Sequence, residues 1–291
     1  MKMKKEQVFY TFHDELFYQL ALPKTKVKEG GASLKLTNES ELLTTQELFL
    51  IMILLDHYKK NDGLGVPISF RDIQVNYRNK RLGKSHYLPR RDYVAYVRAL
   101  NGLQDKWINL DVKQRKRYHI KKTKYDNNPL LRLHASRVEG GNIVFEYALG
   151  EFGDVLLQSK RFSDIIPIDI IRLSYQQITA VYLTLYLSRL IFINKRKKNH
   201  TVTITVNSLM ENIMIHKKSG MNTGKTLNEI LLDDISNKYT YISTFKKHLN
   251  YVLDLFIRDG VIQTYKVIPM ELDEISIKNY KKGKLQIVIK N

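Results

Sequence analysis

The 291-residue sequence contains no cysteine and comparatively few acidic residues. The lack of cysteine excludes disulfide bonds, thiolate zinc sites, iron–sulfur clusters and thiol nucleophiles. The 29 Asp and Glu residues stand against 48 Lys and Arg residues, which gives a formal net charge of +19. A chain with this excess of positive charge is attracted to polyanions, which are nucleic acids or anionic membrane surfaces.

Long hydrophobic runs are also lacking. The longest apolar stretch, residues 178–193, contains threonine, serine and arginine, and it is shorter than the roughly 20 residues of a membrane-spanning helix. Residues 1–10 carry charge but no apolar segment, so they do not resemble a signal peptide. We therefore expect a cytoplasmic protein whose polyanionic partner is a nucleic acid and not a membrane.

Length and composition indicate two globular domains. Hydrophobic residues make up 43% of the chain and aromatic residues 10%, which is enough to form packed cores. A chain of 291 residues corresponds to two domains of about 100–200 residues each. We predict an N-terminal domain over residues 1–150, a connector over 151–173 and a C-terminal domain over 174–291.

Three helices are predicted in the N-terminal half. Thr44 and Glu47 have the spacing of a capping box at the start of an apolar helix that runs to about Lys60. Ser69 is a candidate cap for a short second helix. The third helix begins near Pro89, a residue that suits the first helical position.

Strands are predicted to follow these helices. Residues 107–112 have the composition of a strand, and residues 130–138 and 142–149 flank Gly140-Gly141, a pattern typical of a β-hairpin. Between them lies the most basic run of the chain, Lys113–Lys124, which we predict to form or flank a wing beside the third helix.

The C-terminal half repeats this order. Capping-box spacing at Ser174 and Gln177 precedes an apolar helix from Ile178, and a strand over 201–205 is followed by a second such spacing at Ser208–Glu211. Apolar residues at helical spacing over 242–256 predict the third helix, and residues 285–289 predict a closing strand. The repeat predicts an α+β fold of two tandem winged-helix domains.

The third helix of each half is the candidate for the major groove of DNA, where a helix fits and long polar side chains reach base edges. Arginine pairs with guanine and asparagine with adenine, although the same side chains also occur on the solvated face of an amphipathic helix. The candidate base-contacting residues are Arg90, Arg91, Arg98 and Asn101 in the first half and Ser243, Thr244, Lys246, Lys247 and Asn250 in the second.

Candidate phosphate contacts come from the basic runs. Lysine and arginine side chains in a wing position a protein on DNA without reading its sequence. The residues selected are Arg115, Lys116, Arg117, Lys121, Lys122, Lys281 and Lys282, and Lys195-Arg196-Lys197-Lys198 supplies further candidates.

No catalytic, cofactor or metal site is predicted. Residues 220–226 approach a phosphate-binding loop in sequence, but the first glycine is one residue too close to the second and no buried strand precedes it, so a flexible basic loop is expected. None of the eight histidines has a partner at metal-ligand spacing. Asp233-Asp234 is interpreted as helix capping or solvated surface. We expect a protein that is not an enzyme.

Two stretches resemble the Rep-type initiators of theta-replicating, iteron-containing plasmids. In residues 156–187, Arg161-Phe162-Ser163 leads through Ile165, Ile170 and Leu173 to Tyr182-Leu183-Thr184-Leu185-Tyr186, which is similar to the family's passage from the first wing into the second domain. Residues 42–58 resemble the family's early apolar helix. The resemblance implies tandem winged-helix domains, binding to repeated origin sites in double-stranded DNA, origin opening, recruitment of a host helicase, and dimerisation through the first domain.

Other functions fit the same residues. A winged-helix transcriptional regulator has the same charge and helices, and it differs in binding a single operator. A DNA-bridging or partition adaptor binds DNA with little base preference and a large salt dependence. A nickase, primase or integrase needs a carboxylate cluster or a nucleophilic tyrosine, and a metal-dependent nicking assay distinguishes it.

Overall fold

The computed structural model describes residues 43–63, 66–78, 88–109, 128–139, 142–159, 169–173, 177–217, 222–233 and 238–290, and the short pieces 11–12, 17, 35–36, 116, 162–163 and 220. They divide into two compact units, one up to Phe162 and one from Ser163 onward. This boundary falls within the predicted connector, which contains α6 (Gly150–Ser159), β8 (Phe162–Ser163) and α7 (Asp169–Arg172). Each unit contains helices and strands, which confirms the α+β class.

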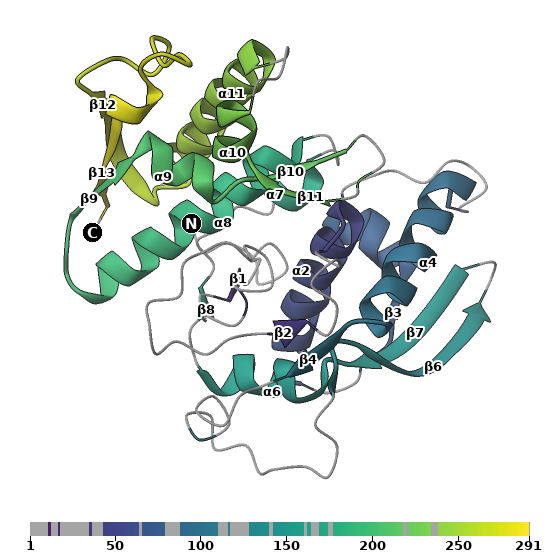
Figure 1. The fold of residues 1–291 in the computed structure, drawn as a ribbon. Coiled ribbons are helices and arrows are strands. Elements are labelled where there is room, and N and C mark those ends of the chain that lie inside the picture. The colour runs from purple at the N-terminus through teal and green to yellow at the C-terminus, as the bar shows by residue number, and fades with distance from the viewer. Residues whose placement is uncertain are drawn as a thin grey trace. The chain divides into compact units, whose positions relative to one another are not determined.

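Helix α2 (Thr45–Lys60) forms the core of the N-terminal unit (Figure 1). Its side chains from Leu48 to Leu55 are each at most 2% exposed, because an apolar surface on every side of a helix must be covered. The predicted capping box is confirmed: the Thr44 hydroxyl accepts from the Glu47 amide at 3.2 Å, and the Thr44 amide donates to Glu47 Oε2 at 2.7 Å.

Six further elements form a three-stranded sheet and the helices beside it. The elements are β3 (Ile68–Ser69), α3 (Phe70–Asp72) continuing into η2 (Ile73–Tyr77), α4 (Arg90–Gln104), and the hairpin of β6 (Arg132–Glu139) and β7 (Asn142–Ala148). The sheet order is β3–β7–β6. Ser69 caps α3 as predicted, accepting from the Asp72 amide at 3.0 Å, whereas Pro89 is the N-cap of α4 and not its first helical residue.

Two strands of a second small sheet lie between α4 and this hairpin in the chain. It has the order β2–β4–β5, from β2 (Lys35–Leu36), β4 (Trp107–Asn109) and β5 (Asn128–Pro129). Strand β4 confirms the start of the predicted strand over 107–112, and residues 110–112 lie outside the described part. The basic run Lys113–Lys124, predicted to form or flank the wing, falls between β4 and β5 in the chain, whereas the turn of the β6–β7 hairpin is at residues 140–141. Apart from Lys116, the run lies outside the described residues.

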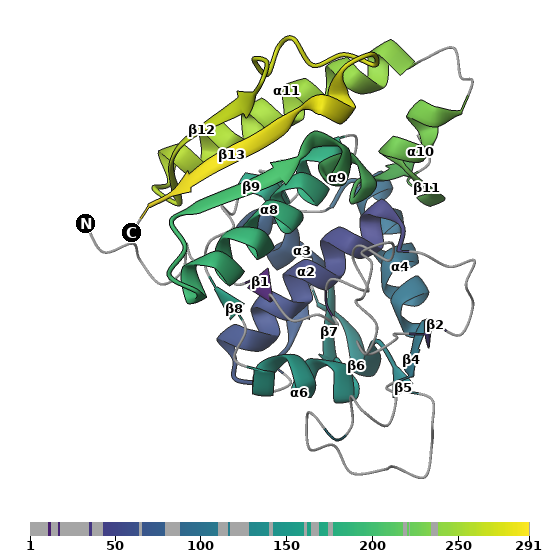
Figure 2. The same ribbon diagram turned by 60° about the vertical axis from the view of Figure 1, so that its left-hand side comes forward.

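The C-terminal unit has the same order of principal elements (Figure 2). They are α8 (Ile178–Arg196), β9 (Thr201–Thr205), α9 (Val206–Glu211), α11 (Lys238–Arg258), β12 (Ile262–Ile268) and β13 (Lys284–Ile289). The sheet order is β12–β13–β9, which matches the first–third–second arrangement of the other unit. The antiparallel hairpin β10 (Met214–His216) and β11 (Asn222–Thr226) and the short helix α10 (Leu227–Leu232) lie between α9 and α11 in the chain.

Two local predictions in this unit are wrong, and a third lies outside the described residues. The third is the cap at Ser174; the structure has Gln177, without a side-chain cap, as the N-cap of α8. Thr205 caps α9 in place of Ser208, because the extended end of β9 puts the Thr205 hydroxyl 3.0 Å from the Ser208 amide. The segment expected to be a flexible loop contains β11, whose last residue, Thr226, caps α10.

Candidate nucleic-acid interface

Helix α11 presents one apolar and one polar face. Ile242, Phe245 and Leu249 on the inner face are at most 5% exposed, and burial of this stripe holds the helix on the unit's core. On the outer side, Ser243, Lys247 and Asn250 are exposed, whereas Thr244 and Lys246 are half-buried. The exposed residues recur every three or four positions and therefore share one face.

Asn250 on that face is held in a fixed orientation. Its carboxamide nitrogen donates to Asp254 Oδ2 at 2.9 Å, and its carboxamide oxygen accepts from the Tyr265 hydroxyl of β12 at 2.9 Å. Burial, together with the nearby charge of Asp254, raises the pKa of Tyr265, so the phenol keeps its donor proton at neutral pH. Each amide atom retains one further bonding position, so Asn250 can still make the pair of bonds that recognises adenine.

Lys246 is attached to the loop that follows β12. Its ammonium group donates to the backbone carbonyl of Asp273 at 2.5 Å. This bond directs one of the predicted base-contacting side chains toward residues 269–283, the loop that joins β12 to β13. Lys281 and Lys282 in the same loop are exposed, and the Lys281 ammonium lies 5.9 Å from the centre of the Tyr280 ring.

The charge on α11 changes along its length. Lys238, Lys246 and Lys247 lie in its first half, while Asp254 lies in the second half. Because a carboxylate repels phosphate, a duplex placed on this face is favoured at the N-terminal half and disfavoured beyond Asn250. This polarity matches the way a recognition helix enters the major groove by its N-terminal residues.

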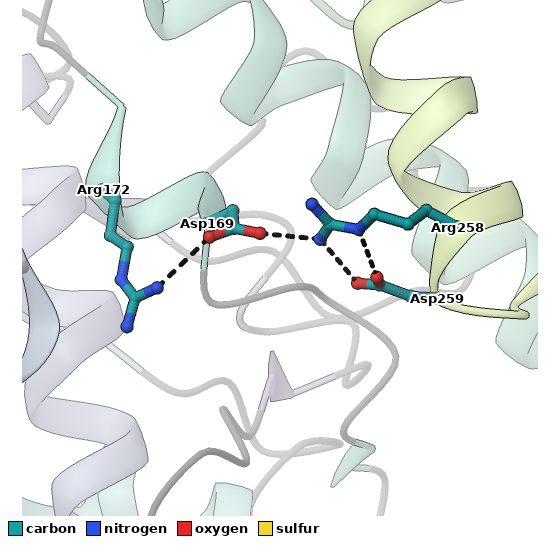
Figure 3. Close-up of polar contacts among 4 residues, drawn as sticks. All are labelled: Asp169, Arg172, Arg258 and Asp259. Carbon is teal, nitrogen blue, oxygen red and sulfur yellow. Dashed lines mark hydrogen bonds and ion pairs between the residues drawn. The ribbon is translucent and has the colours of Figure 1, made fainter.

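Arg258 at the end of α11 forms ion pairs with two carboxylates (Figure 3). Its guanidinium donates to Asp259 at 2.7 and 3.3 Å and to Asp169 of α7 at 2.6 Å, and Asp169 also accepts from Arg172 at 3.3 Å. The hydrogen bonds to Asp259 and then to Asp169 raise the pKa of Arg258. The guanidinium is therefore neutralised within the protein and is not a candidate for phosphate.

Helix α4 presents a comparable face in the N-terminal unit. Arg91, Arg98 and Asn101 recur at helical spacing and are exposed, as is Arg90 beside them. Asn101 Oδ1 accepts from Gln104 Nε2 at 3.5 Å, a long bond that holds the amide only weakly.

Only part of the predicted phosphate-binding set can be placed. Lys116 is exposed and helical. Arg115, Arg117, Lys121 and Lys122 lie outside the residues that the structure describes.

Two tyrosines of the candidate site were not among the predicted site residues: one is exposed on α11, and the other orients Asn250. Tyr239 begins the outer face of α11 one turn before Ser243 and is 78% exposed. Its position follows from extending the helical spacing of the outer face toward the N-terminus. Tyr265 was not identifiable, because its role depends on contact with Asn250, 15 residues earlier in the chain.

The described residues offer no metal site. Within the described ranges, no group of three or more His, Asp or Glu side chains is placed to hold a metal ion. Asp233 pairs instead with Lys225 at 2.6 Å, and Asp234 is not among the described residues. No helix in the described part of the chain combines the length and apolar character needed to cross a membrane.

Comparisons with known proteins give little. Neither a protein-family model nor a curated protein matches the chain. Among solved structures, it is similar to one described as the crystal structure of Pi initiator protein in complex with iteron DNA, at 12% sequence identity and a TM-score of 0.49. The alignment covers 99% of this chain and 100% of that chain. A likeness this weak supports no conclusion about function.

Proposed function

We propose that the protein is a sequence-specific double-stranded DNA-binding protein built from two tandem winged-helix domains. The observation that carries the proposal is the outer face of α11, where an oriented asparagine and exposed lysine and serine side chains precede an antiparallel hairpin whose loop carries the exposed Lys281 and Lys282. In the other unit, helix α4 with its exposed Arg91, Arg98 and Asn101 likewise precedes the β6–β7 hairpin. A helix and a wing used together contact base edges and flanking phosphates.

We further propose that the protein initiates plasmid replication, acting as a binding protein without catalytic activity. This step rests on the sequence resemblance of residues 156–187 and 42–58 to plasmid initiators and on the presence of two candidate recognition helices in one chain. Two units on one chain contact two successive major grooves, about one helical turn apart. Origin opening and recruitment of a host helicase are parts of this proposal.

The first test is selection of bound fragments from random and plasmid DNA at about 150 mM salt, where non-specific binding is weak. Recovery of directly repeated sites beside an AT-rich segment supports an initiator. A single palindromic operator makes the protein a transcriptional regulator, and the absence of any enriched sequence overturns specific recognition. A nicked product in the presence of Mg²⁺ overturns the proposal of a non-enzymatic protein.

A variant separates base reading from phosphate contact at α11. Lys246→Ala combined with Asn250→Ala is expected to lower the affinity for the selected site by roughly ten-fold or more, because loss of a bidentate base contact costs about 1–3 kcal/mol. Affinity for random DNA should fall much less. Lys225→Ala, which removes a charge on β11 paired with Asp233, is the control. Equal losses on both DNAs limit this helix to phosphate contacts.

We also propose that the N-terminal unit forms the homodimer through strand β6. It is an edge strand whose side chains are exposed at every position except half-buried Leu133. The bulge between Leu133 and Ala135 puts Leu133 and Val138 on one face of β6, so antiparallel pairing of two copies centred on Ser136 places Arg132 opposite Glu139 and Leu133 opposite Val138, which is 73% exposed. Sedimentation velocity should show Val138→Lys shifted to monomer. Val75→Lys, at another exposed valine of this unit, is the control, and an unshifted Val138→Lys contradicts this interface.

A further inference from the structure

The turn after α8 gathers four cations that the proposed recognition surface does not use. Lys195, Arg196, Lys197 and Lys198 are all exposed. We call these four residues the basic turn. In the part of the chain that the structure describes, none of the four has an acidic side chain within ion-pair distance. Two exposed cations of this unit, Arg258 and Lys225, are by contrast paired with carboxylates.

The end of helix α8 accounts for the positive charge of only two of these four residues. Lys195 and Arg196 are in the last turn of α8, where cations interact favourably with the helix dipole. Lys197 and Lys198 lie beyond the helix, and the Lys198 amide donates to the Lys195 carbonyl at 3.0 Å, while the Asn199 amide donates to the Asn194 carbonyl at 2.9 Å. This is the Schellman arrangement, in which glycine is the preferred residue at the position of Lys198.

Lys198 therefore occupies an unfavourable backbone conformation. Its φ is +58°, in the left-handed region where a side chain costs free energy and glycine does not. The chain thus keeps a lysine where its own fold favours glycine. Strain of this kind, in a residue whose charge has no acidic partner among the described residues, points to a ligand that needs the charge.

A fifth cation stands beside the turn. The Ile289 amide donates to the His200 carbonyl at 2.7 Å, which brings the end of β13 next to the residues that follow the turn. Lys290 comes directly after and is exposed. Lys290 and the basic turn thus lie at the same end of the sheet, with the Lys290 ammonium next to Gly260, and we call the five residues together the patch.

This patch lies at the opposite end of the sheet from the proposed wing. Strand β9 leaves the turn and pairs with β13, and β13 starts at the loop that carries Lys281 and Lys282 (Figure 2). The six residues of β13 separate the two ends by roughly 20 Å. The N-terminal half of α11 also lies at the wing end in both views (Figures 1 and 2).

We propose that the basic turn and Lys290 bind the phosphate backbone of a second segment of duplex DNA. This inference rests on the proposed DNA binding by α11 and the wing, because it adds a separate phosphate contact at the opposite end of the same unit. Unpaired cations in a row are suited to a run of phosphates and read no bases. The second segment comes either from the same duplex, curved around the unit, or from another duplex.

Two readouts with random-sequence DNA separate these sources. In the first, protein bound to an immobilised duplex of about 20 base pairs captures a second, labelled duplex. In the second, affinity is measured for single duplexes of about 20 to 60 base pairs. The variant Lys197→Gln with Lys198→Gly should lower either the capture of the second duplex or the affinity for the long duplexes about five-fold. The slope of log affinity against log salt for that binding should flatten by about two, because two cations are removed. Its affinity for the short duplex should be unchanged.

The matched control removes two cations from the wing. Lys281→Gln with Lys282→Gln should weaken binding to the short duplex, the reverse of the turn variant. The melting temperature of the turn variant should equal or exceed that of the wild type, since glycine relieves the strain at position 198. Wild-type protein that neither captures a second duplex nor gains affinity with length overturns the inference, as does an unchanged turn variant. Because random DNA is used, absence of a specific site would overturn the proposed function alone.

Discussion

The Tyr265 hydroxyl on β12 donates a hydrogen bond of 2.9 Å to the carboxamide oxygen of Asn250 on α11. The opposite side of the same amide donates to the Asp254 carboxylate, which can only accept. These two partners fix which atom of the amide is oxygen and which is nitrogen. A strand of the hairpin thereby sets the orientation of a side chain on the proposed recognition helix.

Tyr265→Phe removes the donor and leaves the ring in place. We expect the affinity for the selected site to fall about three- to ten-fold, which corresponds to one hydrogen bond of about 0.5–1.5 kcal/mol. Affinity for random DNA should not change, since no charge is lost. Competition binding with both DNAs measures the ratio. Tyr251→Phe, on the same helix, is the control, and an unchanged ratio in Tyr265→Phe removes the positioning role.

The basic run is tested by Arg115→Ala, Lys116→Ala and Arg117→Ala together. If these side chains contact phosphates, all DNA binding weakens and the slope of log affinity against log salt flattens by as much as about three. Fluorescence anisotropy at several salt concentrations gives the slope. An unchanged slope shows that the run does not touch DNA, whichever duplex is used.

The buried ion pair between Lys106 and Glu47 is expected to be important for the stability of the N-terminal unit. The two groups are 2.9 Å apart, and their side chains are only 8% and 6% exposed. Lys106→Ala leaves the Glu47 carboxylate buried without its cation, which should cost about 3–5 kcal/mol. Lys59→Ala removes a pair whose carboxylate, on Asp62, is 86% exposed, and should cost less than about 1 kcal/mol. Urea unfolding followed by the fluorescence of Trp107, the one tryptophan, measures both.

Acid should destabilise the C-terminal unit through His216. Its Nδ1 lies 3.1 Å from the Gly220 carbonyl, so Nδ1 carries the proton and Nε2 accepts from the Tyr182 hydroxyl at 2.8 Å. Burial lowers the pKa of His216 below its ordinary value of 6.5, although the bond to Gly220 opposes the shift. Between the lowered pKa and pH 6.5, His216 is protonated in the unfolded chain but neutral in the folded chain, so acid favours unfolding. The contribution of neutral His216 to the free energy of unfolding is therefore complete above pH 6.5 and is lost as the pH falls through the lowered pKa.

The measurement compares melting temperatures at pH 7.5 and 5.5. His216→Gln keeps a neutral acceptor and should lose less stability on acidification than the wild type does. His200→Gln, at an exposed position, should behave as the wild type. Equal acid sensitivity in wild type and His216→Gln would contradict the assignment.

The principal elements were predictable because they are local or periodic. Capping at Thr44 and Ser69 depends on side chains three residues apart, and the apolar spacing over residues 242–256 of α11 repeats over about four turns. The cap at Thr205 was missed because the preceding conformation decides which hydroxyl faces the helix. Gly102 in the last turn of α4 could not be explained from sequence: a Cβ there would lie 2.0 Å from Glu47 Oε1, so the glycine makes room for the buried carboxylate.

The candidate site was only partly predictable. Which face of α4 and α11 carries polar side chains follows from periodicity, and Arg98, Ser243 and Lys247 are exposed as this requires. Charge density was a poor guide to the wing, because nothing in a run of lysines fixes which strands pair. The partners of Asn250 and of Lys246 come from the hairpin and its loop, so only the tertiary structure reveals them.

Pairing of β4 with β5 puts Trp107 opposite Pro129 and Ile108 opposite Asn128, so the two ends of the segment that holds the basic run meet at one place. A further bond of 2.7 Å from the Leu130 amide to the Lys106 carbonyl closes the same junction. The chain between these strands can therefore vary in length and composition during evolution without changing α4 or the β6–β7 hairpin. Such a closed insertion lets a lineage adjust the electrostatics of the protein, and with it the ionic strength at which it works, independently of its core.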